Sequence, residues 1–145
     1  MDDYELVPGP PDLGSYLHVR QASGLSPKTD EQGRGALTGS WAWCHIRTPS
    51  GEVVAMGRVI GDGAWYFHIA DIATLPEHQR LGLAARVLQA LLDDIENRAP
   101  RGAYVTLIAD PPGQALYRRL GFVPTDPSIA MVWRPGHDQS KSVSA

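Results

Sequence analysis

The sequence contains one cysteine, Cys44, among its 145 residues. A single thiol cannot form an internal disulfide bond or a multi-cysteine metal site. No base is recognisable beside Cys44, so we interpret it as a small buried hydrophobic residue and not as a nucleophile. Four histidines lack metal-ligand spacing and are expected to be structural or exposed: His18, His45, His78 and His137. The sequence therefore predicts no metal site.

Long apolar runs and an excess of positive charge are also missing. No apolar run approaches the roughly 18 residues that a membrane-spanning helix needs, and we do not expect Met1-Asp2-Asp3 to begin a secretion signal. Lys and Arg number 13 against 16 Asp and Glu, which gives a net charge of −3. A nucleic-acid-binding protein would instead carry a basic stripe. We therefore expect a cytoplasmic protein that binds neither membranes nor nucleic acid.

What is present is an ordinary globular composition, with 43% hydrophobic and 20% charged residues. The length suits one domain with a single core, and we expect that domain to span residues 1–135. Residues 136–145 are small and polar and are expected to form a disordered tail. The acidic balance mildly favours a cationic small substrate.

The most informative stretch begins at Trp65 and continues into a helix beyond Pro76. Aromatic and branched residues from Trp65 to Ile72 favour a strand, and Pro76 ends it because proline has no N–H to donate. Apolar residues then recur at helical spacing to about Arg98 and predict an amphipathic helix of about four turns. These apolar residues are Leu83, Val87, Leu88, Leu91, Leu92 and Ile95.

The turn between this strand and helix has few side-chain atoms. Gly82 has no side chain and Ala84 a small one, so a ligand can approach the backbone closely. The first N–H groups of a helix have no partner within it and lie at the positive end of its dipole, which suits a phosphate or pyrophosphate. The dinucleotide-binding fingerprint and the P-loop motif are both absent.

The rest of the chain predicts further strands and short helices. Strands are expected at residues 4–7, 41–48, 52–60, 64–74 and 104–108, the last of them buried, with a closing pair at 122–123 and 129–133. Hairpin turns predict antiparallel pairing, and the strand–helix–strand crossover predicts local parallel pairing. The fold class is therefore α/β (α+β), with a mixed, mostly antiparallel central sheet of about six or seven strands and helices on both faces.

Helices are expected from Leu13 to about Gly24 and at residues 111–120, where Asp110 would cap the helix start. Ser26-Pro27 suits the start of a further, weaker helix. Three glycines make residues 28–39 costly to order, by about 1 kcal/mol for each glycine inside a helix. We expect a mobile segment there, either a substrate lid or simply loose chain.

Two motifs resemble signatures of the GNAT N-acetyltransferase superfamily. Residues 79–84, Gln-Arg-Leu-Gly-Leu-Ala, resemble the Gln/Arg-x-x-Gly-x-Gly/Ala motif that binds the pyrophosphate of acetyl-CoA, and residues 115–122 resemble the second signature. The motifs stand in the family's order, about thirty residues apart, with a helix and a strand between them. The resemblance covers residues 52–133, and the first fifty residues match only in layout. It implies a single GNAT-like domain.

The resemblance also implies a cofactor site. The pyrophosphate would lie against Gln79, Arg80, Leu81, Gly82, Leu83 and Ala84. The pantetheine arm would pair with the backbone of Ile72, Ala73 and Thr74, like an added strand. At the place where the family often has an asparagine that bonds the arm, this chain has Asp110, which cannot donate a hydrogen bond when ionised. We therefore interpret Asp110 as structural.

Acetyl transfer to an amine needs a group that takes the amine proton and an acid that protonates the departing thiolate. Tyr117 occupies the place of the family's acid, although it also suits core packing. His68 is the first candidate base because it is mostly neutral near pH 7. Asp71 is the second candidate, if a bulge re-aims it, and a water chain is the third.

The resemblance implies an acetyl-CoA-dependent N-acetyltransferase without a metal, and we expect a small-molecule primary amine as its acceptor. A protein or peptide acceptor and a non-catalytic acyl-CoA sensor remain alternatives. A homodimer is possible because the family often pairs through its C-terminal strands. Five aromatic residues on neighbouring strands are expected mostly to pack, with some lining the acceptor pocket: Trp41, Trp43, Trp65, Tyr66 and Phe67.

Overall fold

The computed structural model describes residues 3–136, and within them one five-stranded sheet forms the centre of the fold. The strands lie in chain order across the sheet. They are β1 (Glu5–Pro8), β2 (Ala42–Arg47), β3 (Val53–Gly61), β4 (Tyr66–Thr74) and β5 (Tyr104–Leu107). The first four pair antiparallel, and β5 pairs parallel to β4.

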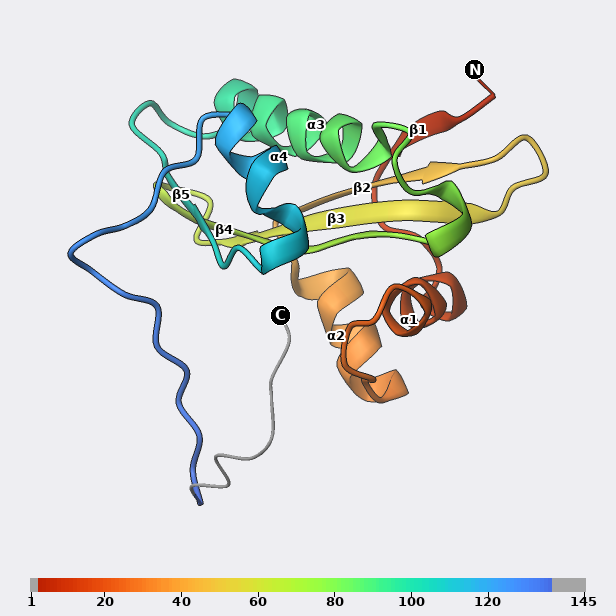
Figure 1. The fold of residues 1–145 in the computed structure, drawn as a ribbon, viewed down its shortest axis with the longest axis horizontal. Helices are drawn as coiled ribbons and strands as arrows, with labels where there is room; N and C mark the ends of the chain where they lie inside the picture. Colours follow the sequence, from red (N-terminus) through yellow and green to blue (C-terminus); the bar gives the residue numbers. More distant parts are fainter. Residues whose placement is uncertain (1–2, 137–145) are drawn as a thin grey trace.

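Helices cover both faces of this sheet (Figure 1). Helices α1 (Leu13–Ala22) and α2 (Asp30–Gly39) lie on one face, and α3 (Leu83–Arg98) and α4 (Gln114–Arg119) lie on the other. Two short 3₁₀ helices, η1 (Pro76–His78) and η2 (Pro111–Gly113), precede α3 and α4. The predicted mixed sheet with helices on both faces is confirmed. None of the helices in residues 3–136 has the length and apolarity needed to cross a bilayer.

The core centres on α3, whose predicted apolar stripe is buried against the sheet. Leu83, Val87, Leu88, Leu91 and Ile95 are each at most 3% exposed. A glycine on β3 allows this close packing. A Cβ atom added to Gly57 would lie 2.5 Å from Ile72 Cδ1 and 2.8 Å from Val87 Cγ1. Gly57 therefore faces α3, and its neighbour Arg58 faces α1 and α2.

Helix α2 covers residues 30–39, so the weaker helix expected in this region is present, and the expectation of loose chain over residues 28–39 was wrong. The N-cap is Thr29 and not Ser26: Thr29 Oγ1 accepts from the Gln32 backbone N–H, and Gln32 Oε1 accepts from that of Thr29. This capping box satisfies two N–H groups at once. Gly33 also has a packing role, since a Cβ atom there would lie 2.6 Å from Leu13 Cδ1. Contact with α1 offsets the entropic cost of the glycines.

The prediction of a closing pair of strands was also wrong, which explains why the sheet has five strands and not six or seven. Residues 122–133 form neither strand nor helix, and in Figure 1 the chain after α4 runs away from the sheet. Pro124 and Pro127 have no N–H to donate to a ladder. Strand β5 is consequently an edge strand and is not buried as predicted; Tyr104 is 49% exposed. The predicted tail lies outside the described residues, except for Gly136.

Candidate active site

Strands β4 and β5 separate in the middle of the molecule. Their last paired residues are Ile69 and Leu107, yet β4 continues to Thr74. Residues 70–74 therefore pair only with β3, and their other edge is not covered by β5. The backbone groups predicted to hold a pantetheine arm, at Ile72, Ala73 and Thr74, lie on this open part of β4.

Strand β4 carries a bulge where it separates from β5. Met56 pairs with Ala73 and Arg58 pairs with Ala70, so Asp71 and Ile72 together face a single residue of β3. Asp71 has a φ of +58°, which is unusual for a residue other than glycine. The bulge turns the Asp71 side chain to the face of α1, where simple alternation would have pointed it toward α3.

Three side chains bind the buried Asp71 carboxylate. The Tyr16 hydroxyl donates to Oδ2 at 2.6 Å, Arg58 Nε donates to Oδ2 at 2.8 Å, and Arg20 Nη1 donates to Oδ1. Burial, followed by the hydrogen bond to Asp71, raises the pKa of Tyr16 to about 12, so this phenol stays neutral. Arg20 also donates to the Ser26 carbonyl oxygen at 2.8 Å. With both oxygens engaged, Asp71 joins α1 to the sheet and is poorly placed to accept a substrate proton.

His68 lies on β4 opposite Ile60 and two pairs away from Arg58, so it shares their face of the sheet. Its Nδ1 is 2.9 Å from Thr106 Oγ1, and that hydroxyl also approaches the Phe67 carbonyl oxygen at 3.4 Å. This arrangement favours a proton on Nδ1, which leaves Nε2 as a proton acceptor. Burial, followed by the charge of Arg58, lowers the pKa of His68. The ring is therefore neutral at pH 7.

Tyr117 lies in α4, on the opposite side of the sheet from His68. Its half-buried ring packs edge-on against Phe122 at 6.2 Å between centroids and covers Gly113, where a Cβ atom would lie 2.7 Å from Cε2. Burial, followed by the charge of Asp110, raises the pKa of Tyr117. The phenol therefore keeps its proton at neutral pH and is able to donate it.

The loop before α3 has two left-handed residues. Arg80 has a φ of +65° and Gly82, the N-cap of α3, has a φ of +79°. Gln79 Nε2 donates to the Thr74 carbonyl oxygen at 3.0 Å, which connects the loop to the end of β4. A Cβ atom on Gly82 would meet no atom within 4 Å, so the space in front of this helix start is open. Leu81 is exposed, whereas Leu83 is buried.

Asp110 precedes η2 as predicted, but its side chain makes no capping hydrogen bond, so the predicted side-chain cap was wrong. The Gly113 N–H bonds the Asp110 carbonyl oxygen instead, at 3.0 Å. The carboxylate is exposed, and its charge acts on Tyr117. Cys44 is buried as predicted, and burial raises the pKa of its thiol to about 12.

The aromatic residues divide between core and surface. Trp43 and Phe67 are buried, and Trp43 packs edge-on against Tyr16 at 5.2 Å. Trp65 and Tyr66 are about half exposed and, with Tyr104, form a row of edge-on rings, each 5.4 Å from the next. This row lies at the β4 and β5 end of the sheet.

Sequence reasoning missed four residues of the site: Tyr16, Arg20, Arg58 and Thr106. Tyr16 and Arg20 lie within the helix predicted from Leu13 to about Gly24, and no further role was predicted for them. An arginine in the middle of a strand, at Arg58, was the available signal, because a charged residue there needs a partner or solvent. The partner of Arg58 was not evident, because the alternation of apolar and polar residues along β4 does not reveal the bulge that turns Asp71 toward Arg58.

Comparisons with known proteins agree with this geometry. A family model described as an acetyltransferase (GNAT) domain matches residues 29–138, more than half of the chain. A solved Staphylococcus aureus structure, described as a probable acetyltransferase, superposes with a TM-score of 0.84 at 32% identity, covering 90% of this chain and 98% of that one.

Two named acetyltransferases are also similar. The catalytic subunit NAA20 of the Arabidopsis thaliana N-terminal acetyltransferase B complex is 31% identical over 72 residues, which is 47% of this chain and 41% of that protein. The Escherichia coli ribosomal-protein-S18-alanine N-acetyltransferase shares the fold, with a TM-score of 0.67 at 21% identity, covering 81% of this chain and 76% of that one. The matched parts span about half the length, or less, of the curated relatives.

Proposed function

This chain belongs to the GNAT acetyltransferase family, and from that premise we propose that it transfers an acetyl group from acetyl-CoA to a primary amine of a small molecule. The observation that carries the proposal is the opening between β4 and β5. Tyr117 lies on one side of it and His68 on the other, and the start of α3 lies at its end.

The chain has a place for each part of acetyl-CoA. The N–H groups at the start of α3 suit the diphosphate, because they are unpaired within the helix and the space before Gly82 is open. The edge of residues 70–74 that β5 does not cover suits the amide groups of the pantetheine arm. Acetyl-CoA supplies an activated acyl group, so no covalent bond to the protein is needed.

The residues of this chain then have separate tasks. His68 Nε2 accepts the proton that the amine loses as its nitrogen bonds the acyl carbon. Backbone N–H groups of β4 stabilise the negative charge that develops on the carbonyl oxygen. Tyr117 donates its proton to the sulfur as the carbon–sulfur bond breaks. Asp71 holds the bulge in place, since Arg20 and Tyr16 of α1 bind its carboxylate.

The test is release of free thiol from acetyl-CoA with a panel of about a hundred amines, run for the wild type and for Tyr117→Phe. We expect Tyr117→Phe to lower kcat by roughly 10²- to 10⁴-fold, the usual contribution of a general acid, while acetyl-CoA still binds. Tyr104→Phe, which removes the hydroxyl of an exposed tyrosine on β5, is the control and should keep its rate. Full turnover by Tyr117→Phe would remove Tyr117 from the mechanism.

A second candidate acceptor is the N-terminal amine of a peptide. It is favoured by similarity to NAA20 and to the S18-alanine enzyme, whose names state such activities. Mass spectrometry of peptide and small-amine panels after incubation with acetyl-CoA separates the two candidates. Binding of coenzyme A without thiol release for any acceptor would instead indicate a sensor.

We also propose a homodimer, formed through the exposed apolar segment after α4.

A further inference from the structure

Arg58 is the one charged side chain on β3 in the described residues, and it lies on the same face of the sheet as His68. Its guanidinium group is anchored on two sides. Nε donates to Asp71 at 2.8 Å, and Nη1 donates to Ser40 Oγ at 3.1 Å. The group also lies 5.9 Å from the centre of the Trp43 ring. These contacts fix the plane of the guanidinium next to the bulge of β4.

One nitrogen of Arg58 remains available. Among residues 3–136, every buried side-chain nitrogen or oxygen atom has a hydrogen-bond partner. Within the same residues, no hydrogen bond involves Arg58 Nη2. Nη2 therefore reaches solvent, which agrees with an exposed fraction of 18% for the Arg58 side chain, against 2% for Arg20. A guanidinium nitrogen with unused N–H groups is a donor prepared for an anion.

The charges around Asp71 do not balance. One carboxylate binds two guanidinium groups, and the third partner, Tyr16, is a neutral phenol. Arg20 is buried and also engaged by Ser26, so the uncompensated positive charge is available only at Arg58. The effect of Arg58 reaches His68, since its charge contributes to the lowered pKa of that ring. A partly buried positive charge therefore faces the candidate base.

We propose that Arg58 Nη2 binds an anionic group of the acceptor, so that the substrates are amines that also carry a carboxylate or a phosphate. The inference rests on the proposed acetyl transfer and assigns its substrate class. It opposes the expectation of a cationic substrate from the net charge of −3. The charge of Arg58 next to the candidate base determines which acceptor binds, more than the net charge of the chain does. Exposed charges farther away than a Debye length, about 8 Å at physiological salt, are largely screened.

The test compares matched pairs of amines that differ only in the charge of one group. One arm uses aminoalkanoic acids of two to five carbons and their carboxamides, and the other uses aminoalkyl phosphates and the corresponding amino alcohols. We expect kcat/KM of the wild type to be about tenfold or more higher for the anionic member of at least one arm, as for a charge-assisted hydrogen bond. The arm with the larger ratio distinguishes carboxylate from phosphate.

The variants Arg58→Gln and Arg58→Lys assign this preference to Arg58. Arg58→Gln should abolish it by lowering kcat/KM for the anionic amines much more than for their neutral partners, and Arg58→Lys should retain part of it. Arg47→Gln removes a surface arginine that pairs with Glu5, and it should leave the ratio unchanged. If Arg58→Gln does not fold, the inference is tested by the ratio of kcat/KM between anionic and neutral amines in the wild type and by the fall of that ratio in Arg58→Lys.

Three results would overturn the inference. A wild-type ratio near one in both arms would exclude an anionic acceptor and leave the acetyltransferase proposal intact. An equal loss for both members of each pair in Arg58→Gln would show that Arg58 is only structural. Absence of thiol release with every amine and peptide would remove the proposed function and this inference together.

Discussion

His68 combines a neutral ring with a free Nε2, and both properties come from its neighbours. Thr106 fixes the ring through Nδ1, while burial and Arg58 disfavour its protonated form. The lowered pKa means that His68 remains a base at a pH where an ordinary histidine, with a pKa of about 6.5, is already half protonated.

This predicts the pH dependence of catalysis. In a plot of log kcat/KM against pH, protonation of the amine alone gives a slope of about one on the acid side. Protonation of His68 increases this slope to about two below the pKa of His68, which is lower than 6.5. His68→Gln should lose the second slope and most of its rate. If the steeper acid limb persists in His68→Gln, another group or a water chain is the base.

Asp71 has a structural task that can be measured as stability. Asp71→Asn leaves the buried Arg20 and the partly buried Arg58 without a counter-charge, and breaking such a pair costs roughly 3 to 5 kcal/mol. Urea denaturation should therefore show a large fall in the free energy of unfolding. Asp94→Asn, which breaks a surface pair with Arg98, should cost about 0.5 kcal/mol. Similar losses in the two variants would contradict this account.

At this scale, sequence reasoning identified residues that stand within motifs or have distinctive chemistry, such as Tyr117 and His68. It did not identify Arg58 as the partner of Asp71, because their contact depends on a bulge and on the pairing of two strands. Neither feature is encoded in the spacing of the residues along the chain. The roles assigned to Tyr117 and His68 remain predictions.

We propose that cofactor binding depends on the start of α3. Gly82 has a positive φ and open space around its Cβ position, so a side chain there would meet no protein atom and would enter the space proposed for the diphosphate. Gly82→Leu should raise the KM for acetyl-CoA about tenfold or more, since it obstructs the N–H groups that suit a diphosphate.

Backbone strain must be separated from loss of binding. Gly102→Leu is the matched control, because Gly102 also has a positive φ, +89°, with no atom within 4 Å of its Cβ position. Both variants should lose about 1 to 2 kcal/mol of stability from the left-handed conformation. Only Gly82→Leu should change the KM. An unchanged KM in Gly82→Leu, or an equal rise in both variants, would exclude the loop as the diphosphate site.

Elements with strong local patterns were predicted well. Helix α3 has a continuous apolar stripe, and the hairpins between β2, β3 and β4 have clear turn residues. Helix α2 was predicted only as a weak helix starting at Ser26, because its three glycines outweighed the capping box at Thr29, and its stability depends on contact with α1. The segment after α4 was expected to form strands from its apolar residues alone, but strands also need a partner edge.

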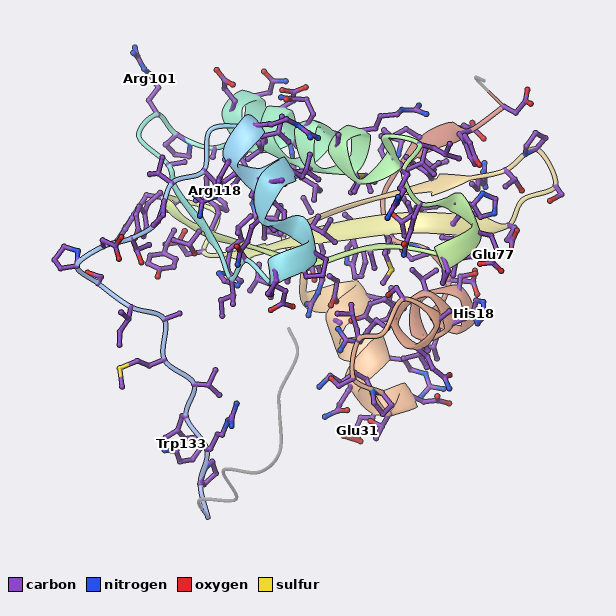
Figure 2. The ribbon with its side chains drawn as sticks, viewed as in Figure 1. His18, Glu31, Glu77, Arg101, Arg118 and Trp133 are labelled. Carbon is purple, nitrogen blue, oxygen red and sulfur yellow. The ribbon has the colours of Figure 1, made fainter. Side chains whose placement is uncertain are left out.

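At the scale of the whole molecule, an exposed apolar surface remains after α4. Five large apolar residues on this segment are 50% to 86% exposed: Val123, Ile129, Met131, Val132 and Trp133. Trp133 lies far from the sheet (Figure 2). Strand β5 offers an unpaired edge on the same side of the molecule (Figure 1). Apolar side chains gathered in this way usually mark an interface.

We therefore expect a homodimer in which this segment packs on a second copy of the chain. Size-exclusion chromatography with light scattering should give twice the monomer mass of 15.7 kDa. The double variant Met131→Glu, Trp133→Glu should give a monomer, because it places charges in an apolar interface. His18→Glu, at an exposed position of α1, is the control and should remain dimeric. A wild-type monomer at about 100 μM, well above the Kd of a stable dimer, would contradict the proposal.

The central claim is that the start of α3 and the open edge of β4 together bind coenzyme A. Calorimetric titration of the full chain with acetyl-CoA tests it most directly, because it needs no knowledge of the acceptor. The account predicts one site per chain with a Kd on the order of 1 to 100 μM, weakened in Gly82→Leu and retained in Tyr117→Phe. Absence of binding at about 1 mM acetyl-CoA would contradict the account.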